Sequence, residues 1–140
     1  MSKSRPQCGL ILENSKGEVL LQFRDNNLSI PYPDCLGTFG GEIESGETPE
    51  QAIVREIWEE LRYKLKNFEY FGNFPFDGYD IHNFRKVDPN IRLEDLVVRE
   101  GQRAVFISER DVMINKYRFA FNCQQILIEY FRKFHQSTFP

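Results

Sequence analysis

Three glutamates lie close together in the middle of the chain and have the residue type and spacing to bind a divalent cation. Glu56, Glu59 and Glu60 occupy positions i, i+3 and i+4, so on a helix their carboxylates project from one side. Carboxylate oxygens suit Mg²⁺ and Mn²⁺, with water and substrate phosphates filling the remaining positions. Gly40-Gly41 lies upstream, and a backbone without Cβ atoms can approach a metal or a phosphate closely. The chemistry indicated is metal-assisted attack of water on a diphosphate.

A solvated acidic surface is the alternative explanation for these carboxylates. Acidic side chains on one helical face are most often only exposed charge, and like charges at this spacing repel by roughly 0.2–0.5 kcal/mol per pair. Arg55 can neutralise part of that charge. The three glutamates alone do not decide between the two explanations.

The surrounding spacing favours a site, because it resembles the signature sequence of the Nudix hydrolase family. Gly41 is followed after five residues by Glu47, and seven further residues lead to Arg55-Glu56-Ile57, one residue and Glu59-Glu60. Seven of the nine defined positions of the family signature are present. The resemblance spans the loop, the helix start and the helix itself.

The end of the signature departs from the family pattern. Arg62 stands where the family has glycine, and Tyr63 stands where it has a bulky aliphatic residue. Glycine there suits a left-handed helix cap, in which any other residue costs about 1 kcal/mol. We therefore expect the helix to continue for another turn. Because neither position touches metal in this family, we expect the chemistry to be retained.

Carried over position by position, the resemblance implies a set of site residues. The implied metal ligands for Mg²⁺ or Mn²⁺ are Gly41, Glu56, Glu59 and Glu60, and the three glutamates are also implied to be catalytic. Glu47 and Arg55 are implied to orient these ligands from behind.

Two weaker parts of the resemblance lie outside the signature. Arg24, at the end of a strand-like stretch, is implied to bind a substrate phosphate, and Glu100 is implied to bind metal or act as the catalytic base. Each of these residue types is also common as a simple solvating charge. Phe39 and Gly40 are expected to contact substrate, since the Phe39 ring, like Tyr32, could stack on a base.

The elements that position these residues follow from the hydrophobic pattern. A helix is predicted over residues 49–61, with Thr48 and Gln51 as a capping box and Pro49 in its first turn. Its buried stripe is predicted to comprise Ile53, Ile57 and Leu61, widened by Val54 and Trp58. Strands are predicted at residues 8–12, 19–23, 36–39, 68–76, 79–87, 93–98 and 104–107, and a second helix at 119–134.

This order of elements predicts an α/β fold with a mixed β-sheet covered on both faces. The first two strands are expected to form a hairpin, and Gly40-Gly41 is expected to end the third. The family resemblance specifies the fold as the Nudix α/β/α sandwich, and we expect one domain over residues 1–140.

Composition limits the partners. With 140 residues, 41% hydrophobic and 28% charged, the chain is expected to fold as one globular domain. The net charge of −3 argues against a long nucleic acid as partner. Three widely spaced cysteines suit reduced thiols in the cytoplasm, and no apolar run approaches the ~18 residues that span a membrane. The expected partner is a small nucleotide, and homodimers, which are common in the family, remain open.

Two functions remain at this point. The first is a metal-dependent hydrolase that cleaves the pyrophosphate bond of a nucleoside diphosphate derivative, such as a nucleoside triphosphate or a nucleotide-sugar. The second is a catalytically inactive Nudix-like domain that binds a nucleotide as a sensor. The intact glutamates Glu56, Glu59 and Glu60 favour the first, because a sensor has no need to retain them.

Overall fold

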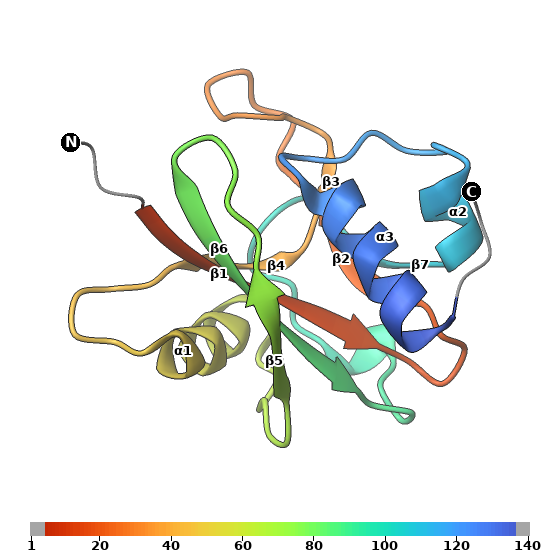
Figure 1. Cartoon of the computed structure of the whole chain (residues 1–140), viewed down its shortest axis with the longest axis horizontal. Coiled ribbons are helices and arrows are strands. Elements are labelled where there is room, and N and C mark those ends of the chain that lie inside the picture. The colour runs from red at the N-terminus through yellow and green to blue at the C-terminus, as the bar shows by residue number, and fades with distance from the viewer. Residues whose placement is uncertain (1–4, 137–140) are drawn as a thin grey trace.

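The strand β1 (Arg5–Glu13) runs through the middle of a mixed sheet (Figure 1). The structure is a computed structural model that describes residues 5–136. The residues of β1 from Cys8 onward are all buried, as expected for a strand covered on both faces. β1 pairs in parallel with β6 (Tyr79–Val87). On its other edge it pairs antiparallel with β4 (Phe39–Glu42) and then, at Glu13, with β2 (Val19–Phe23).

The remaining strands extend the sheet on either side of this centre. β3 (Leu36–Gly37) and β7 (Arg103–Ile107) pair antiparallel with β2, and β5 (Glu69–Asn73) pairs antiparallel with β6. The described chain thus forms one sheet of seven strands with both parallel and antiparallel pairs. The predicted mixed sheet and the predicted β1–β2 hairpin are confirmed, and Gly17 in the hairpin turn has a φ of 74°.

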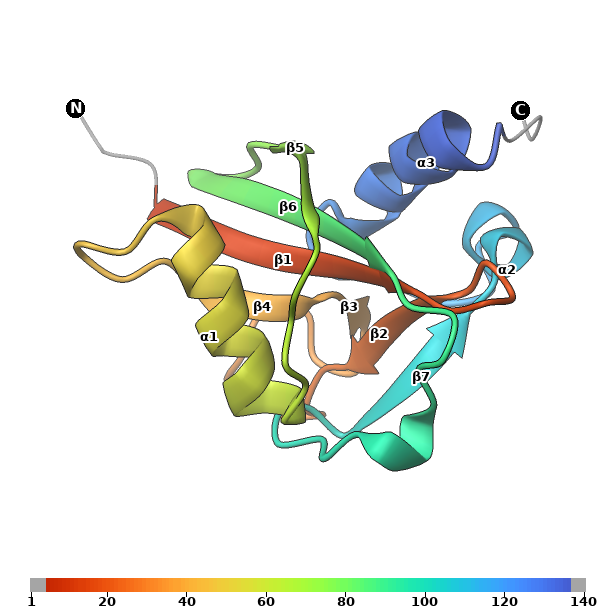
Figure 2. The same ribbon diagram turned by 90° about the horizontal axis from the view of Figure 1, so that it is seen from below.

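The helix α1 (Pro49–Leu61) covers one face of the sheet and spans the residues 49–61 predicted from the hydrophobic pattern (Figure 2). The Thr48 side chain accepts the Gln51 N–H, and the Gln51 side chain bonds back to the Thr48 backbone, which is the predicted capping box. Ile53, Ile57 and Leu61 are fully buried against the sheet. The prediction that Val54 and Trp58 widen this stripe is wrong: both are exposed, because α1 turns only a narrow apolar face to the sheet.

The exit of α1 differs from the prediction that the helix continues. Arg62 adopts the left-handed conformation, with a φ of 54°, and its N–H donates to the Trp58 carbonyl at 3.0 Å. Tyr63 then turns inward, packs against the core and donates its hydroxyl to Asp88 Oδ2 at 2.6 Å. This packing and hydrogen bond direct the chain away from the helix axis, so a non-glycine residue occupies the cap that glycine favours.

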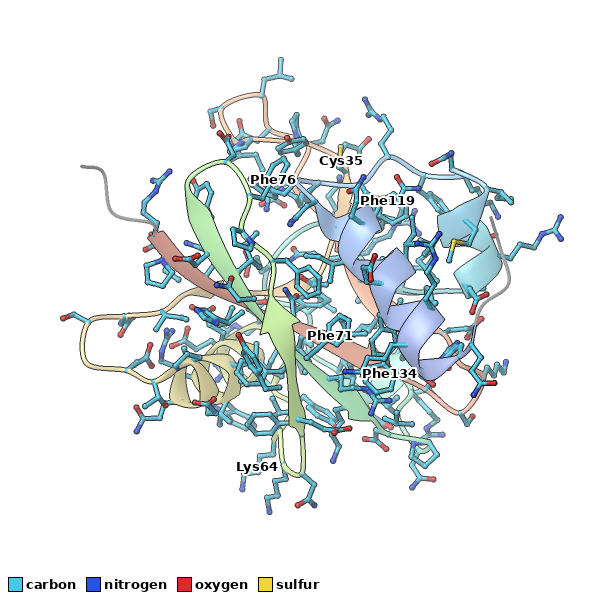
Figure 3. All side chains as sticks on the ribbon, in the orientation of Figure 1. Cys35, Lys64, Phe71, Phe76, Phe119 and Phe134 are labelled. Atoms are coloured by element: carbon cyan, nitrogen blue, oxygen red, sulfur yellow. The ribbon has the colours of Figure 1, made fainter. Side chains whose placement is uncertain are left out.

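The opposite face of the sheet is covered by α2 (Glu109–Met113) and α3 (Cys123–Phe134). Phe71 of β5 and Phe134 of α3 meet there, with ring centroids 5.8 Å apart (Figure 3). α3 begins four residues later than predicted, because the preceding segment bonds to β3 instead: Leu36 donates to the Arg118 carbonyl, and Ala120 donates to the Leu36 carbonyl. The short α2 was not predicted. Helices on both faces confirm the predicted α/β/α arrangement.

Two strand predictions are corrected. Residues 93–98 form a 3₁₀ turn, η1 (Leu93–Asp95), and an irregular segment; its apolar side chains Leu93, Val97 and Val98 lie exposed instead of against the sheet. The predicted strand at 36–39 is divided into β3 and β4, and Gly40-Gly41 lies within β4, opposite Gly9 and Cys8 of β1, instead of ending the strand.

No helix within residues 5–136 has the length and apolar character needed to cross a membrane. Cys8, Cys35 and Cys123 are all buried free thiols.

Candidate active site

Two glycines in β4 bring the helix carboxylates against the sheet. Gly40 has a φ of 152°, and a Cβ placed on it would lie 2.0 Å from the Cys8 carbonyl oxygen, so no other residue fits beside β1. A Cβ on Gly41 would lie 2.7 Å from the Glu56 carboxylate. The bare backbone at these two positions therefore forms a cradle into which α1 projects its acidic side chains.

Glu60 is the innermost of these carboxylates. It is only 4% exposed, and its Oε2 accepts the Gly40 N–H at 3.2 Å. Its Oε1 is one of two buried side-chain oxygens among residues 5–136 that have no hydrogen-bond partner. Burial raises the pKa of Glu60, and the neighbouring carboxyls of Glu100 and Glu56 raise it further. A buried carboxyl with an unsatisfied oxygen beside like charges is typical of a functional site.

Arg55 ties the loop before α1 to the helix. Its guanidinium donates to both oxygens of Glu47, at 2.7 and 2.9 Å, and to the Glu42 carbonyl at 3.0 Å. It also donates to Glu56 at 3.0 Å and to Glu59 at 3.2 Å. The bonds from Arg55 lower the pKa of Glu47 to about 2. Glu47 and Arg55 thus lie behind the acidic residues and fix the geometry of the loop and the helix.

The three glutamates of α1 are not grouped together. The Glu59 side chain is 56% exposed and turns toward Arg55, whereas Glu56 is mostly buried beside Gly41 and Glu60 is buried deepest. Within residues 5–136, no three His, Cys, Asp or Glu side chains are arranged to hold a metal ion as they stand. The structure brings together Glu56, Glu60 and Glu100, and leaves Glu59 at the rim.

The Gly41 carbonyl points toward β1. It accepts the Cys8 thiol proton, with 3.4 Å between sulfur and oxygen. Burial is the main cause that raises the pKa of Cys8, to about 12, so the thiol keeps its proton and remains a donor. The Gly41 oxygen is therefore bonded to the Cys8 thiol of β1, while the Gly41 Cα faces the Glu56 carboxylate.

A cleft of about 360 Å³ opens next to the cradle. Gly40, Gly41, Arg24 and Glu100 line it together, although they come from three separate parts of the sequence. Arg24 donates to the Pro31 carbonyl at 3.2 and 2.9 Å, and its guanidinium stands 5.3 Å from the centre of the Phe121 ring. Four of the predicted site residues thus line one cleft, and two of them, Gly40 and Gly41, contribute the backbone of β4.

Phe39 does not take part in this cleft. Its side chain is 2% exposed and packs in the core between α1 and the sheet. A ring enclosed in this way cannot stack on a ligand, so the contact predicted for Phe39 is wrong. The alternation of β4 explains the error, because Phe39 and Gly40 face opposite sides of the strand.

The cleft is also lined by residues from the start of β6 and from the segment before α3. They are Tyr79 and three residues that the sequence did not single out, Ile81, Phe121 and Asn122. Phe121 is in contact with Tyr32, with ring centroids 4.7 Å apart, and with Tyr79 at 6.2 Å. The rings of Phe121 and Tyr79 line the cleft because segments distant in the sequence meet there, and Tyr32 packs against Phe121.

Comparison with known proteins agrees with the geometry. The model of the NUDIX domain matches residues 3–135, which is nearly the whole chain. The chain belongs to the Nudix family. Its cradle, its acidic helix and the arginine behind them lie on the signature residues of that family.

Individual relatives match a part of this Nudix chain. The NAD-capped RNA hydrolase NudC of Pseudomonas aeruginosa is 35% identical over 83 residues, which cover 51% of this chain and 29% of that protein. The RNA pyrophosphohydrolase of Mannheimia succiniciproducens is 44% identical over 57 residues, which cover 41% of this chain and 26% of that protein. The chain therefore spans less than a third of the length of either curated relative.

A solved structure matches over a larger share of both chains. The MutT structure from the work on Aliivibrio salmonicida and Vibrio cholerae superposes with a TM-score of 0.67 at 26% sequence identity. The match covers 84% of this Nudix chain and 88% of the other. The similarity in fold thus extends well beyond the signature helix.

Proposed function

We propose that this Nudix protein hydrolyses the pyrophosphate bond of a small nucleoside diphosphate derivative, such as a nucleoside triphosphate or a nucleotide-sugar, with Mg²⁺ or Mn²⁺ as cofactor. The observation that supports this most is Glu60, whose buried carboxyl has one oxygen without a partner and lies beside Glu56 and Glu100, of which Glu100 lines the cleft. Such an arrangement costs stability and suits a site that receives positive charge.

The residues fit a divalent cation. The free oxygen of Glu60, the Glu56 carboxylate and the Gly41 carbonyl are hard oxygen ligands around a cradle that a Cβ would fill. Glu59 would join them by leaving Arg55, to which it is bound on the exposed side of α1. When bound, Mg²⁺ or Mn²⁺ would supply positive charge against the pyrophosphate oxygens.

Proton transfer falls to the carboxylates of the site. Glu100 is exposed, lines the cleft and lies close enough to Glu60 to raise the pKa of that carboxyl. We assign to Glu100 the role of general base, which accepts the proton of the attacking water. Glu60, whose pKa is raised, would be kept ionised by the cation that it binds.

The cleft offers contacts for both parts of a nucleotide. Arg24 would bind a phosphate oxygen by exchanging its bonds to the Pro31 carbonyl for a charged acceptor. The rings of Tyr79, Phe121 and Tyr32 would contact the base, since base stacking on an aromatic side chain contributes ~1–3 kcal/mol in nucleic-acid sites. A pocket of about 360 Å³ is within the size range of small-molecule sites.

The names of the relatives add RNA ends to the possible substrates. One is a hydrolase of NAD-capped RNA and another an RNA pyrophosphohydrolase. The net charge of −3 provides no general attraction for a polynucleotide, so we favour a small nucleotide. We also propose that the protein acts in the cytoplasm, where its three free thiols would stay reduced.

A screen for hydrolysis products tests this function. Purified protein with Mg²⁺ or Mn²⁺ would be incubated with nucleoside triphosphates, dinucleoside polyphosphates, nucleotide-sugars and a short triphosphorylated RNA, each with and without EDTA, and the products would be separated by ion-exchange chromatography. We expect metal-dependent formation of the cleaved nucleotide from at least one small substrate. Glu59→Gln should lower kcat by at least about a hundredfold, or ~3 kcal/mol of transition-state stabilisation.

The same screen distinguishes a hydrolase from a nucleotide-binding sensor domain. A protein that binds nucleotides without hydrolysing any of them would be a sensor domain. Unchanged turnover by Glu59→Gln would reject the role of that residue, and turnover in EDTA would reject the metal.

A further inference from the structure

The segment that carries Glu100 is anchored on both sides of the site. On one side, the Arg99 N–H donates to the Glu60 carbonyl at 2.8 Å, in the last turn of α1. On the other, the Gln102 N–H donates to the Phe23 carbonyl at 2.8 Å, at the end of β2. The Glu100 side chain therefore extends from a short bridge between the acidic helix and the sheet.

The turn within this bridge has no spare room. Gly101 has a φ of 76°, and a Cβ placed on it would lie 2.5 Å from Gln22 Oε1 and 2.7 Å from the Phe23 carbonyl oxygen. The backbone of Gly101 therefore packs directly against β2, between Glu100 and Gln102.

The Gln102 side chain makes a second connection across the cleft rim. Its Nε2 donates to the Arg24 carbonyl at 2.8 Å and to Asp34 Oδ1 at 2.7 Å. Asp34 closes the loop after β2, since its N–H donates to the Asp25 carbonyl at 3.2 Å. Both hydrogens of one amide are thus used to join the Glu100 segment to this loop.

The same loop holds the other functional side chain on this side of the cleft. Pro31, within the loop, accepts the Arg24 guanidinium at 2.9 Å. A single amide therefore connects the segment of the expected base, Glu100, with the segment of the expected phosphate-binding residue, Arg24.

We infer that Gln102 is a positioning residue, which holds Glu100 and Arg24 at a fixed separation across the mouth of the cleft. This inference rests on the proposed function and adds to it a residue outside the family signature. Gln102 does not touch the reacting atoms; it acts through the two residues that it connects.

An exchange of amide and carboxylate tests this role. Gln102→Glu places a carboxylate against Asp34 and the Arg24 carbonyl, so we expect kcat to fall at least about tenfold, as for a displaced catalytic group. KM should rise as well, because the Arg24 carbonyl loses its donor and Arg24 is no longer held in place. In the double variant Gln102→Glu with Asp34→Asn, the carboxylate and the amide exchange places and the two side chains can form a hydrogen bond again. The double variant should recover a large part of kcat but not all, because the Arg24 carbonyl still lacks its donor.

Stability and a matched substitution serve as controls. The pair lies on the exposed rim, so the melting temperature of each variant should stay within about 2 °C of the wild type. Gln125→Glu makes the same change on an exposed position of α3 and should leave kcat unchanged. Wild-type kcat in Gln102→Glu, or no recovery in the double variant, would overturn the inference. If the wild-type protein hydrolysed none of the substrates, that result would instead reject the proposed function.

Discussion

Two buried glutamates on opposite faces of the sheet have opposite surroundings. Glu60, on the α1 side, is 4% exposed, has one oxygen without a partner and lies near two other carboxyls. Glu13, at the end of β1, is 9% exposed, and its Oε1 accepts the Tyr130 hydroxyl at 2.6 Å and His135 Nε2 at 2.9 Å. Burial of the two carboxyls is similar, whereas their hydrogen-bond donors and their neighbouring charges differ.

The donors around Glu13 form a complete structural network. Tyr130 is fully buried and accepts from Arg85 Nε at 3.3 Å, and His135 also faces Glu109 at 3.4 Å. A buried polar group surrounded by donors stabilises the fold, whereas a buried group without them lowers stability and persists where function requires it. The contrast indicates that Glu13 joins α3 to the sheet, and it supports the role that we propose for Glu60.

The largest effect is expected from Glu60→Gln. The variant should lose at least about a hundredfold in kcat, or ~3 kcal/mol, while its stability without metal rises or stays equal, because a neutral amide removes the charge that burial disfavours. The raised pKa of Glu60 gives the sign of the pH effect. The folded state holds a proton that the unfolded state loses above its ordinary pKa of about 4.3, so stability falls as pH rises beyond that value.

Thermal melts in EDTA between pH 4 and pH 8, together with kcat assays, check this prediction. We expect the pH-dependent loss to be smaller in Glu60→Gln than in the wild type. Glu129→Gln, on an exposed position of α3, is the matched control. A variant that is both less stable and fully active would show that Glu60 resembles Glu13 after all.

The second effect should be a loss of stability without a loss of activity. Tyr130→Phe removes the hydroxyl that bonds Glu13 and leaves that buried carboxylate with one donor fewer, at a cost of about 1–3 kcal/mol. Activity well below the melting temperature should not change, because Glu13 lies five residues along β1 from Cys8 at the cleft, or about 16 Å. Urea unfolding and initial rates measure the two quantities, and a large fall in kcat would contradict the separation of the regions.

The smallest effect concerns the exit of α1, next to Glu60. Arg62 has a φ of 54°, so Arg62→Gly should raise stability by up to about 1 kcal/mol. The contact of the Arg62 guanidinium with the Trp58 ring, at 5.2 Å, offsets part of this gain. Urea unfolding of the variant beside Arg92→Gly, on an exposed site before η1, provides the comparison. A less stable Arg62→Gly would show that the ring contact outweighs the backbone strain.

Local signals in the sequence were sufficient for the elements that carry the site. The capping box of Thr48 and Gln51 and the stripe of Ile53, Ile57 and Leu61 placed α1 at its observed ends, because these contacts lie within four residues of each other. The strand periods placed β2 and β6 in the same way. The local signals did not reveal that residues 93–98 lack a neighbouring strand or that residues 118–120 bond to β3. Pairing of a strand depends on a partner that is distant in the sequence.

The sequence by itself determined the Nudix signature, the helix that presents it and the two glycines against which that helix packs. Only the tertiary structure decided that Glu60 is buried while Glu59 faces Arg55, that Phe39 belongs to the core, and that Gln102 joins Asp34 to the Glu100 segment. The reason is physical. Residue spacing fixes the direction of a side chain relative to its own helix or strand, whereas burial and hydrogen-bond partners depend on which distant segments pack against it.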